Sequence, residues 1–233
     1  MATMADLLNA SEKGWIVVGW FTPEYRPLAE RLASQLDGNG APYHLYAIGD
    51  FGGSFFERTR FKPQIVQRAI EEYPERTIVL MDVDCLVNGD IAPLIQKINA
   101  DVGIMLKPRQ GRPPRITLAA SSRVMVFRPT PGARRFVETW ASLCASPENR
   151  THDDEMCLAW AYVLCPARCE HIPLEYAARE VGYAAGKQQI IAHASENARR
   201  NPQRLTLKSV LRRIERRFFR TGKSAAWKEA HLG

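Results

Sequence analysis

The chain has 233 residues, of which 45% are hydrophobic and 24% are charged, with a formal net charge of +7. This length and composition allow one sizeable hydrophobic core and leave little room for a second full domain. No apolar run is long enough to cross a bilayer, because a spanning helix needs about 20 residues. The polar amino terminus has neither a cationic start nor an apolar core, so we expect a cytoplasmic protein without a secretory signal.

Strand and helix patterns alternate along the first part of the chain. The apolar run 15–22 predicts a buried strand, and 27–36 predicts an amphipathic helix. A second strand at 43–48, a glycine-rich loop and a second helix at about 63–72 follow. Strands separated by helices predict an α/β fold with a parallel, doubly wound sheet whose binding crevice lies at the carboxyl ends of the strands.

A third apolar strand runs into two aspartates, Asp82 and Asp84, in the sequence TIVLMDVDCLV. If the strand continues, both side chains lie on the same face, because side chains repeat with period two. Two close carboxylates repel each other unless a cation lies between them, and oxygen ligands favour Mg²⁺ or Mn²⁺. The alternative is that the two aspartates cap a turn, which the following Asn88-Gly89-Asp90 also favours.

The order of these elements, together with the motif MDVDCLVNGDI, resembles the nucleotide-diphospho-sugar transferases of the GT-A fold. The resemblance covers most of the chain and is closest to the retaining branch related to glycogenin and the bacterial lipopolysaccharide galactosyltransferases. It implies a Rossmann-like GT-A fold with a mostly parallel central sheet flanked by helices. It also implies metal-dependent transfer of a sugar, with retention of configuration, from a UDP-sugar to a glycan, lipid-linked or other hydroxyl acceptor.

The resemblance also assigns donor-binding roles. Thr22 and Tyr25 match the Thr and Tyr that contact the nucleotide base, and Arg58 or Lys62 matches a basic residue that meets the donor. Alternatively, Tyr25 only packs on the following helix, and the basic residues only form a solvated surface.

A metal site follows from the same resemblance. Asp82 and Asp84 match the family's DxD pair, of which Asp82 also meets the donor, and His193 matches a later histidine that completes the metal site. Imidazole is an acceptable third ligand for Mn²⁺ or Mg²⁺ beside two carboxylates. A lone histidine is otherwise an ordinary hydrogen-bonded side chain.

The segment THDDE, 151–155, precedes an apolar helix. Thr151 as N-cap, with acidic residues in the first turn, is what helix capping favours. The resemblance places an acidic residue here beside the transferred sugar, and Asp153 or Asp154 would serve. Such a carboxylate could bind sugar hydroxyls or act as a general base towards the acceptor hydroxyl.

Two segments depart from the family pattern. The family's Asn-Ser/Ala-Gly step is replaced by Ser121, Ser122 and Arg123, and its tail motif of Gly, Lys, Pro and Trp after the histidine is missing. In addition, the segment Lys107 to Arg115 predicts a basic, proline-rich flexible loop that closes over the site or meets the acceptor.

The end of the chain is strongly basic. We therefore divide the chain into a transferase domain at 1–200 and a basic amphipathic helical tail at 201–233, which carries nine Lys or Arg and two Glu. A cationic helix with an apolar face favours an anionic membrane, such as the inner membrane face, and would suit a lipid-linked acceptor. The alternative is a helix that packs on the protein body; binding to nucleic acid is less favoured.

Two other functions remain open. A phosphohydrolase of the haloacid-dehalogenase type also has a DxD motif after an apolar strand, although usually on its first strand and followed by Gly-Thr. A sugar-nucleotide-binding protein without catalysis would need the same donor site, with THDDE acting only as a helix cap.

Overall fold

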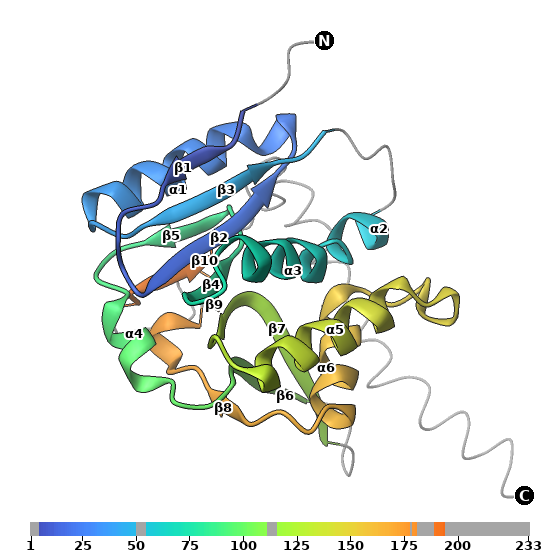
Figure 1. The fold of residues 1–233 in the computed structure, drawn as a ribbon. Helices are drawn as coiled ribbons and strands as arrows, with labels where there is room; N and C mark the ends of the chain where they lie inside the picture. The colour runs from blue at the N-terminus through green and yellow to red at the C-terminus, as the bar shows by residue number, and fades with distance from the viewer. Residues whose placement is uncertain (1–4, 50–54, 111–115, 178, 181–188, 194–233) are drawn as a thin grey trace, which may run out of the picture. The chain divides into compact units, whose positions relative to one another are not determined.

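A mixed sheet of seven strands, in the order β1-β3-β2-β4-β7-β6-β8, forms the centre of the computed structural model. The structure describes residues 5–49, 55–110, 116–177, 179–180 and 189–193 (Figure 1). The strands of this sheet are β1 (Leu7–Asn9), β2 (Trp15–Phe21), β3 (Tyr43–Ala47), β4 (Thr77–Met81), β6 (Val102–Gln110), β7 (Ile116–Phe127) and β8 (Cys169–His171).

A second, smaller sheet and the helices complete the described fold. The small sheet has the order β5-β10-β9, with β5 (Cys85–Val87), β9 (Arg179–Glu180) and β10 (Ile191–His193). The helices are α1 (Arg26–Gly38), α2 (Phe55–Thr59), α3 (Lys62–Glu72), α4 (Ala92–Lys97), α5 (Pro131–Ala145) and α6 (Asp154–Leu164), with single 3₁₀ turns η1 (Pro23–Tyr25), η2 (Pro147–Asn149) and η3 (Leu174–Tyr176).

The large sheet contains parallel pairs in two places. Strand β2 pairs in parallel with both β3 and β4, and β8 pairs in parallel with β6. Strand β7 runs antiparallel between β4 and β6, and β1 adds an antiparallel edge. The predicted α/β fold is confirmed, as are the two strands and two helices expected before the DxD motif.

Helices cover both faces of the sheet, so two hydrophobic clusters form (Figure 1). Strand β2 shows the division, because Val17 and Phe21 pack in the cluster of α1 and α4, whereas Ile16 and Val18 pack in the cluster of α3, α5 and α6. This alternation is the period-two pattern of a strand that is buried on both faces.

One predicted loop is partly wrong. Residues 107–110 of the expected loop continue strand β6, which pairs with β7 as a long antiparallel hairpin. Backbone pairing along this hairpin satisfies the polar groups that a loop would leave to water. Residues 111–115 lie outside the described part of the chain, and so does the basic tail, 201–233.

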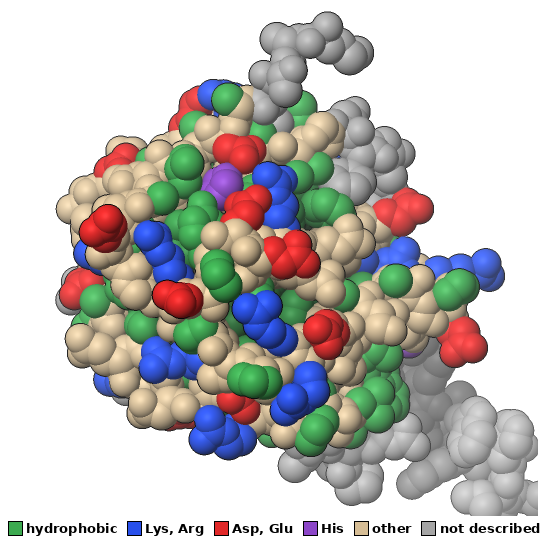
Figure 2. Space-filling view, in the orientation of Figure 1, with side chains coloured by type: hydrophobic (Ala, Val, Ile, Leu, Met, Phe, Trp, Pro, Cys, Tyr) green, Lys and Arg blue, Asp and Glu red, His purple; other side chains and the backbone are tan. Residues whose placement is uncertain are grey.

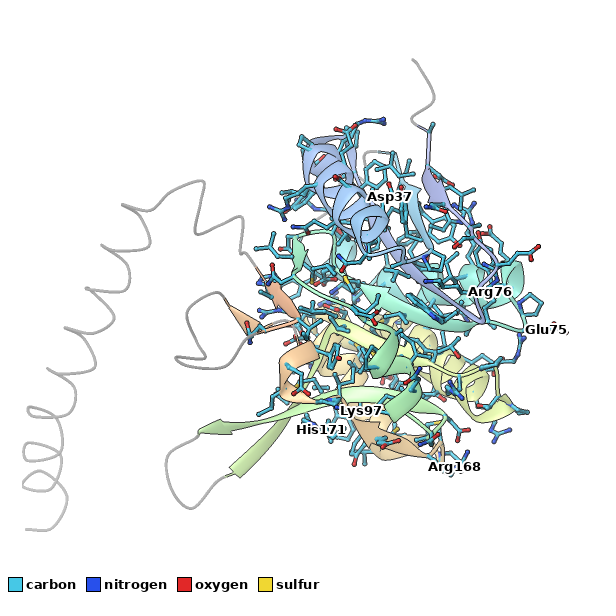
Figure 3. All side chains as sticks on the ribbon, turned by 90° about the vertical axis from the view of Figure 1, so that its left-hand side faces the viewer. Asp37, Glu75, Arg76, Lys97, Arg168 and His171 are labelled. Carbon is cyan, nitrogen blue, oxygen red and sulfur yellow. The ribbon has the colours of Figure 1, made fainter. Side chains whose placement is uncertain are left out.

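The described surface mixes charges of both signs. Figure 2 shows acidic and basic side chains interspersed over one face. In Figure 3, Lys97 and Arg168 lie away from Asp37, towards the other end of the molecule, where Arg168 pairs with Asp101 at 3.4 Å and Lys97 pairs with Glu175 at 3.6 Å. Among the described residues, no helix has the length and apolar character needed to span a membrane.

Candidate active site

The DxD motif forms a tight turn at the carboxyl end of β4. The backbone N–H of Cys85 donates to the backbone oxygen of Asp82 at 2.9 Å, and the N–H of Asp82 donates to Arg123 on β7. The strand therefore ends before the motif, and the expectation that Asp82 and Asp84 share one strand face is wrong. The turn directs the two carboxylates to different partners.

Lys62, the first residue of α3, lies between two carboxylates. Its ammonium nitrogen is 2.8 Å from Oδ1 of Asp82 and 3.2 Å from Oδ2 of Asp154. The Lys62 residue is only 8% exposed. Burial alone would lower the pKa of Lys62, but Asp154 and Asp82 outweigh it and raise the pKa above its ordinary value. The ammonium group therefore stays charged inside the protein.

Asp82 has an environment that partly opposes its ionisation. Burial raises the pKa of Asp82 to about 6, against the lowering effect of Lys62, and the nearby Asp84 and Asp154 add to the rise. These four groups form one interacting charge cluster at the carboxyl end of β4. Such clusters of perturbed groups are typical of functional sites.

Asp154 is the buried acid at the start of α6. Its Oδ2 accepts a short hydrogen bond from the hydroxyl of Ser122 on β7, and Lys62 donates to the same hydroxyl at 3.0 Å. The indole of Trp140 on α5 donates to the backbone oxygen of Asp154 at 3.1 Å. Asp154 is 3% exposed. Contacts from β7, α3 and α5 hold it in position.

Asp153 has a different role from Asp154. The carboxylate of Asp153 accepts the backbone N–H of Met156 at 2.8 Å, so Asp153 is the N-cap of α6. The sequence predicted Thr151 as the N-cap, but Thr151 lies two residues before the observed N-cap. Of the two candidate acids, the structure brings only Asp154 to Lys62 and Asp82.

Asp84 meets His193 through the small sheet. Strand β10 pairs antiparallel with β5 in a register that places His193 opposite Cys85, and Nε2 of His193 is 2.9 Å from Oδ2 of Asp84. This brings together two predicted metal ligands that are 109 positions apart in the sequence. His193 is 7% exposed, and its Nδ1 has no hydrogen-bond partner among the described residues.

The 2.9 Å between Asp84 and His193 is a direct hydrogen-bond or ion-pair distance. Carboxylate and imidazole are also residue types that can bind a divalent cation. Asp82 is engaged by Lys62 instead, so no group of three metal-binding side chains occurs in the described ranges. Asp84 and His193 would therefore be the first residues to hold the ion.

The other predicted donor residues lie at the end of the neighbouring strand β2. Thr22 is 2% exposed, and its hydroxyl has no hydrogen-bond partner within the described ranges. Tyr25 packs partly buried against the α1 cluster. Arg58 on α2 is 3.4 Å from Glu24, so it lies beside this segment and not with Lys62.

Sequence reasoning missed the roles of Ser122 and Trp140. In the sequence, Ser122 stands out only as a departure from a family pattern. Trp140 has no feature that indicates a role in the site, because an indole in an amphipathic helix is usually a core residue. Both act through contacts between separate elements, on β7, α3, α5 and α6.

The sequence matches no protein-family model and no curated protein. Solved structures do match. A glycosyltransferase involved in the glycosylation of the major capsid of PBCV-1 has 16% identity and a TM-score of 0.56, over 79% of this chain and 98% of that one. The glycosyltransferase GlyE of Streptococcus pneumoniae TIGR4 has 13% identity and a TM-score of 0.53, over 78% of this chain.

This protein has the GT-A glycosyltransferase fold. The match spans 55% of the GlyE chain, and identities this low show the fold alone. In this GT-A fold the cluster of Lys62, Asp82 and Asp154 lies where open α/β sheets place their ligands, beyond the carboxyl ends of the parallel strands.

Proposed function

We propose that this protein is a metal-dependent glycosyltransferase that transfers a sugar from a nucleoside diphosphate sugar, specifically a UDP-sugar, to a hydroxyl acceptor with retention of configuration. The observation that carries the proposal is the buried Lys62 held between Asp82 and Asp154 at the carboxyl end of β4. Lys62 and Asp154 are buried and Asp82 is partly buried. Burying charged groups is costly, and binding a charged donor is a function that would explain why these groups are kept there.

The leaving diphosphate is the group that this site has to stabilise. Negative charge grows on the diphosphate as the anomeric carbon becomes oxocarbenium-like, and a fixed cation in a water-poor site stabilises that charge strongly. Lys62 supplies such a cation, whereas Arg58 pairs with Glu24. Asp84, His193 and Asp82 would hold Mn²⁺ or Mg²⁺, which supplies charge neutralisation at the phosphate oxygens.

Asp154 is the residue we assign to the transferred sugar. Its Oδ2 is engaged by Ser122 and Lys62, whereas no partner for Oδ1 occurs among the described residues. An ionised carboxylate with one free oxygen can accept hydrogen bonds from sugar hydroxyls or take the proton of the acceptor hydroxyl. Asp153 instead serves the helix as its cap.

The nucleotide base would bind beside η1. Thr22 offers a buried hydroxyl without a described partner, and Tyr25 offers a partly exposed ring three residues later. These groups follow β2, which pairs directly with β4, so base and diphosphate would bind at neighbouring strand ends.

The acceptor is a carbohydrate, and we favour a lipid-linked one used at the inner face of a membrane, with the protein itself in the cytoplasm. Two features support this proposal. The tail 201–233 is basic and amphipathic in sequence. In addition, α6 has an exposed apolar face that begins two residues after Asp154 and consists of Met156, Trp160, Val163 and Leu164.

The two other functions are less well supported. The fold is that of glycosyltransferases, and the DxD motif follows the third parallel strand of the sheet, whereas a dehalogenase-type phosphohydrolase carries it on the first. A binding protein without catalysis would not need the carboxylate of Asp154 beside the buried Lys62.

Calorimetric titration with nucleoside diphosphates and UDP-sugars tests the proposal. With Mn²⁺ present we expect selective binding of a uridine ligand, and with the metal chelated we expect this binding to disappear. Asp84→Ala should abolish metal-dependent binding, whereas Asp37→Ala, which changes a carboxylate on the exposed end of α1, should not. If binding is changed neither by chelation of the metal nor by Asp84→Ala, the metal-dependent transferase is ruled out. If a uridine ligand binds but no sugar is transferred, the non-catalytic binding protein is favoured.

A further inference from the structure

Both oxygens of Asp82 are occupied by one internal cation. The ammonium nitrogen of Lys62 is 2.8 Å from Oδ1 and 3.0 Å from Oδ2 of Asp82. A divalent cation would have to bind the same two oxygens, because a carboxylate binds a metal through its oxygens, and it would repel the ammonium group already held there. A metal ion that joins Asp82 to Asp84 and His193 would therefore weaken the contact between Asp82 and Lys62.

Lys62 has other partners that can keep it if Asp82 leaves. An ammonium group has three donors, and Lys62 also reaches Oδ2 of Asp154 at 3.2 Å and the hydroxyl of Ser122 at 3.0 Å. Loss of Asp82 would leave the buried ammonium with one carboxylate and one hydroxyl. The charge would stay paired, so the exchange would avoid the high cost of an isolated buried charge.

We propose that Lys62 competes with the divalent cation for Asp82, and that Asp154 and Ser122 hold Lys62 when the metal takes Asp82. The inference rests on the metal site of the proposed function. It makes Lys62 a positioning residue for the metal, in addition to its contact with the donor.

The exchange links the metal to the sugar site. In the metal-free arrangement Lys62 divides its charge between Asp82 and Asp154, whereas in the metal-bound arrangement Asp154 and Ser122 are its remaining described partners. Metal binding thus changes the surroundings of the carboxylate that we assign to the sugar.

Titration with Mn²⁺ alone tests the competition. In a double-mutant cycle, the Mn²⁺ affinity would be measured for the unmodified 233-residue protein, for Lys62→Met, for Asp82→Asn and for the double variant. We expect Lys62→Met to bind Mn²⁺ on the order of tenfold more tightly, a usual size for coupled sites. In the Asp82→Asn background the same change should give no gain. A gain of equal size in both backgrounds would mean simple charge repulsion and would overturn the proposal, as would unchanged or weaker binding by Lys62→Met.

A charge-neutral variant removes the ambiguity of changing a cation, and also covers the case in which Lys62→Met does not fold. In Ser122→Ala, the released Lys62 has only Asp154 among its described partners, so we expect Mn²⁺ binding to weaken about fivefold, at the lower end of usual couplings. Ser122→Thr keeps the hydroxyl and should restore the affinity. Equal affinity in Ser122→Ala and the unmodified protein would overturn the proposal.

Two comparisons separate this inference from the proposed function. Lys97→Met removes an exposed cation that pairs with Glu175, and it should leave Mn²⁺ affinity unchanged. If the unmodified protein binds Mn²⁺ and a uridine ligand but the cycle shows no coupling, only the competition between Lys62 and the metal is contradicted. If the protein binds neither Mn²⁺ nor a uridine ligand, both the proposed function and the competition are contradicted.

Discussion

The indole nitrogen of Trp140 donates a hydrogen bond to the backbone oxygen of Asp154, and this bond ties the middle of α5 to the first residue of α6. Trp140 is fully buried in the cluster that α5 and α6 share. The position of Asp154 is therefore set partly by a residue for which no contact with Lys62 or Asp82 is seen.

Replacing this indole should weaken both stability and activity. Trp140→Phe keeps most of the apolar contact but leaves the Asp154 carbonyl without the indole donor, so we expect the free energy of unfolding to fall by about 1–2 kcal/mol. Thermal unfolding measures the loss. Trp160→Phe is the matched control, because Trp160 is 51% exposed on α6, and its replacement should change stability by less than about 0.5 kcal/mol.

The neighbouring acids Asp153 and Asp154 should differ sharply in kinetics. Asp154→Asn keeps the size of the side chain but removes its charge, and we expect turnover to fall at least about 100-fold with the fold retained. Asp153→Ala removes only the N-cap of α6, so stability should fall by about 1 kcal/mol and turnover should stay within a few-fold. Sugar transfer and circular dichroism would be measured on both variants. The reverse ranking of the two turnover values would contradict the assignment of Asp154.

Gly19 permits the close approach of β2 to the end of β4. A Cβ atom at Gly19 would lie 2.7 Å from the backbone oxygen of Met81 and 3.2 Å from the Leu45 side chain. Because a backbone atom cannot move aside as a flexible side chain does, we expect Gly19→Ala to cost about 2 kcal/mol. Urea unfolding measures this cost, and a disturbed DxD turn should also lower donor binding.

Gly38 supplies the control for Gly19. It is exposed at the end of α1, and a Cβ atom there would meet nothing within 4 Å. Alanine has the higher helix propensity, so Gly38→Ala should be neutral or stabilise the protein by up to about 1 kcal/mol. A similar loss of stability in both variants would argue against steric contact at Gly19.

Asp101 should make stability depend on acid pH. Burial acts to raise its pKa, but hydrogen bonds from the Arg168 backbone and the Thr130 hydroxyl, together with the Arg168 guanidinium, lower it below its ordinary value. A lowered pKa in the folded state stabilises the protein above the unfolded pKa of about 3.9, and this stabilisation is lost as the pH falls through the folded pKa.

Comparison of Asp101→Asn with the unmodified protein measures this effect. Hydrogen bonds to a charged group contribute about 2 kcal/mol, so we expect a difference of this size in urea unfolding at neutral pH. The difference should shrink below about pH 4, where the unmodified carboxylate also becomes protonated. A difference that does not change with pH would mean that the charge of Asp101 has no part in stability.

The basic tail should carry any attachment to membranes. The chain 1–202 lacks all nine Lys and Arg of the tail, so we expect it to remain in solution when the 233-residue chain sediments with anionic vesicles. High salt should release the full-length protein, because screening weakens attraction between exposed charges. Equal sedimentation of both forms would assign attachment elsewhere, and the exposed apolar face of α6 would be the next region to test.

The sequence by itself determined the strands and helices that lead to the DxD motif. Apolar runs such as 15–22 and 77–81 are local signals, because a strand buried on both faces needs nearly continuous apolar residues. The amphipathic helices had the same kind of local signal. The resemblance to GT-A enzymes followed from the order of these elements, and the solved structures confirm that fold.

Only the tertiary structure decided which charged residues meet. The pairing of Asp84 with His193 depends on the register of β10 against β5, and the contacts of Lys62 depend on where α3 and α6 begin relative to β4. The choice between Asp153 and Asp154 likewise depended on a one-residue shift in the start of α6. Sequence patterns report the burial of single elements, whereas contacts across 20 to 109 positions depend on how packed elements are arranged in space.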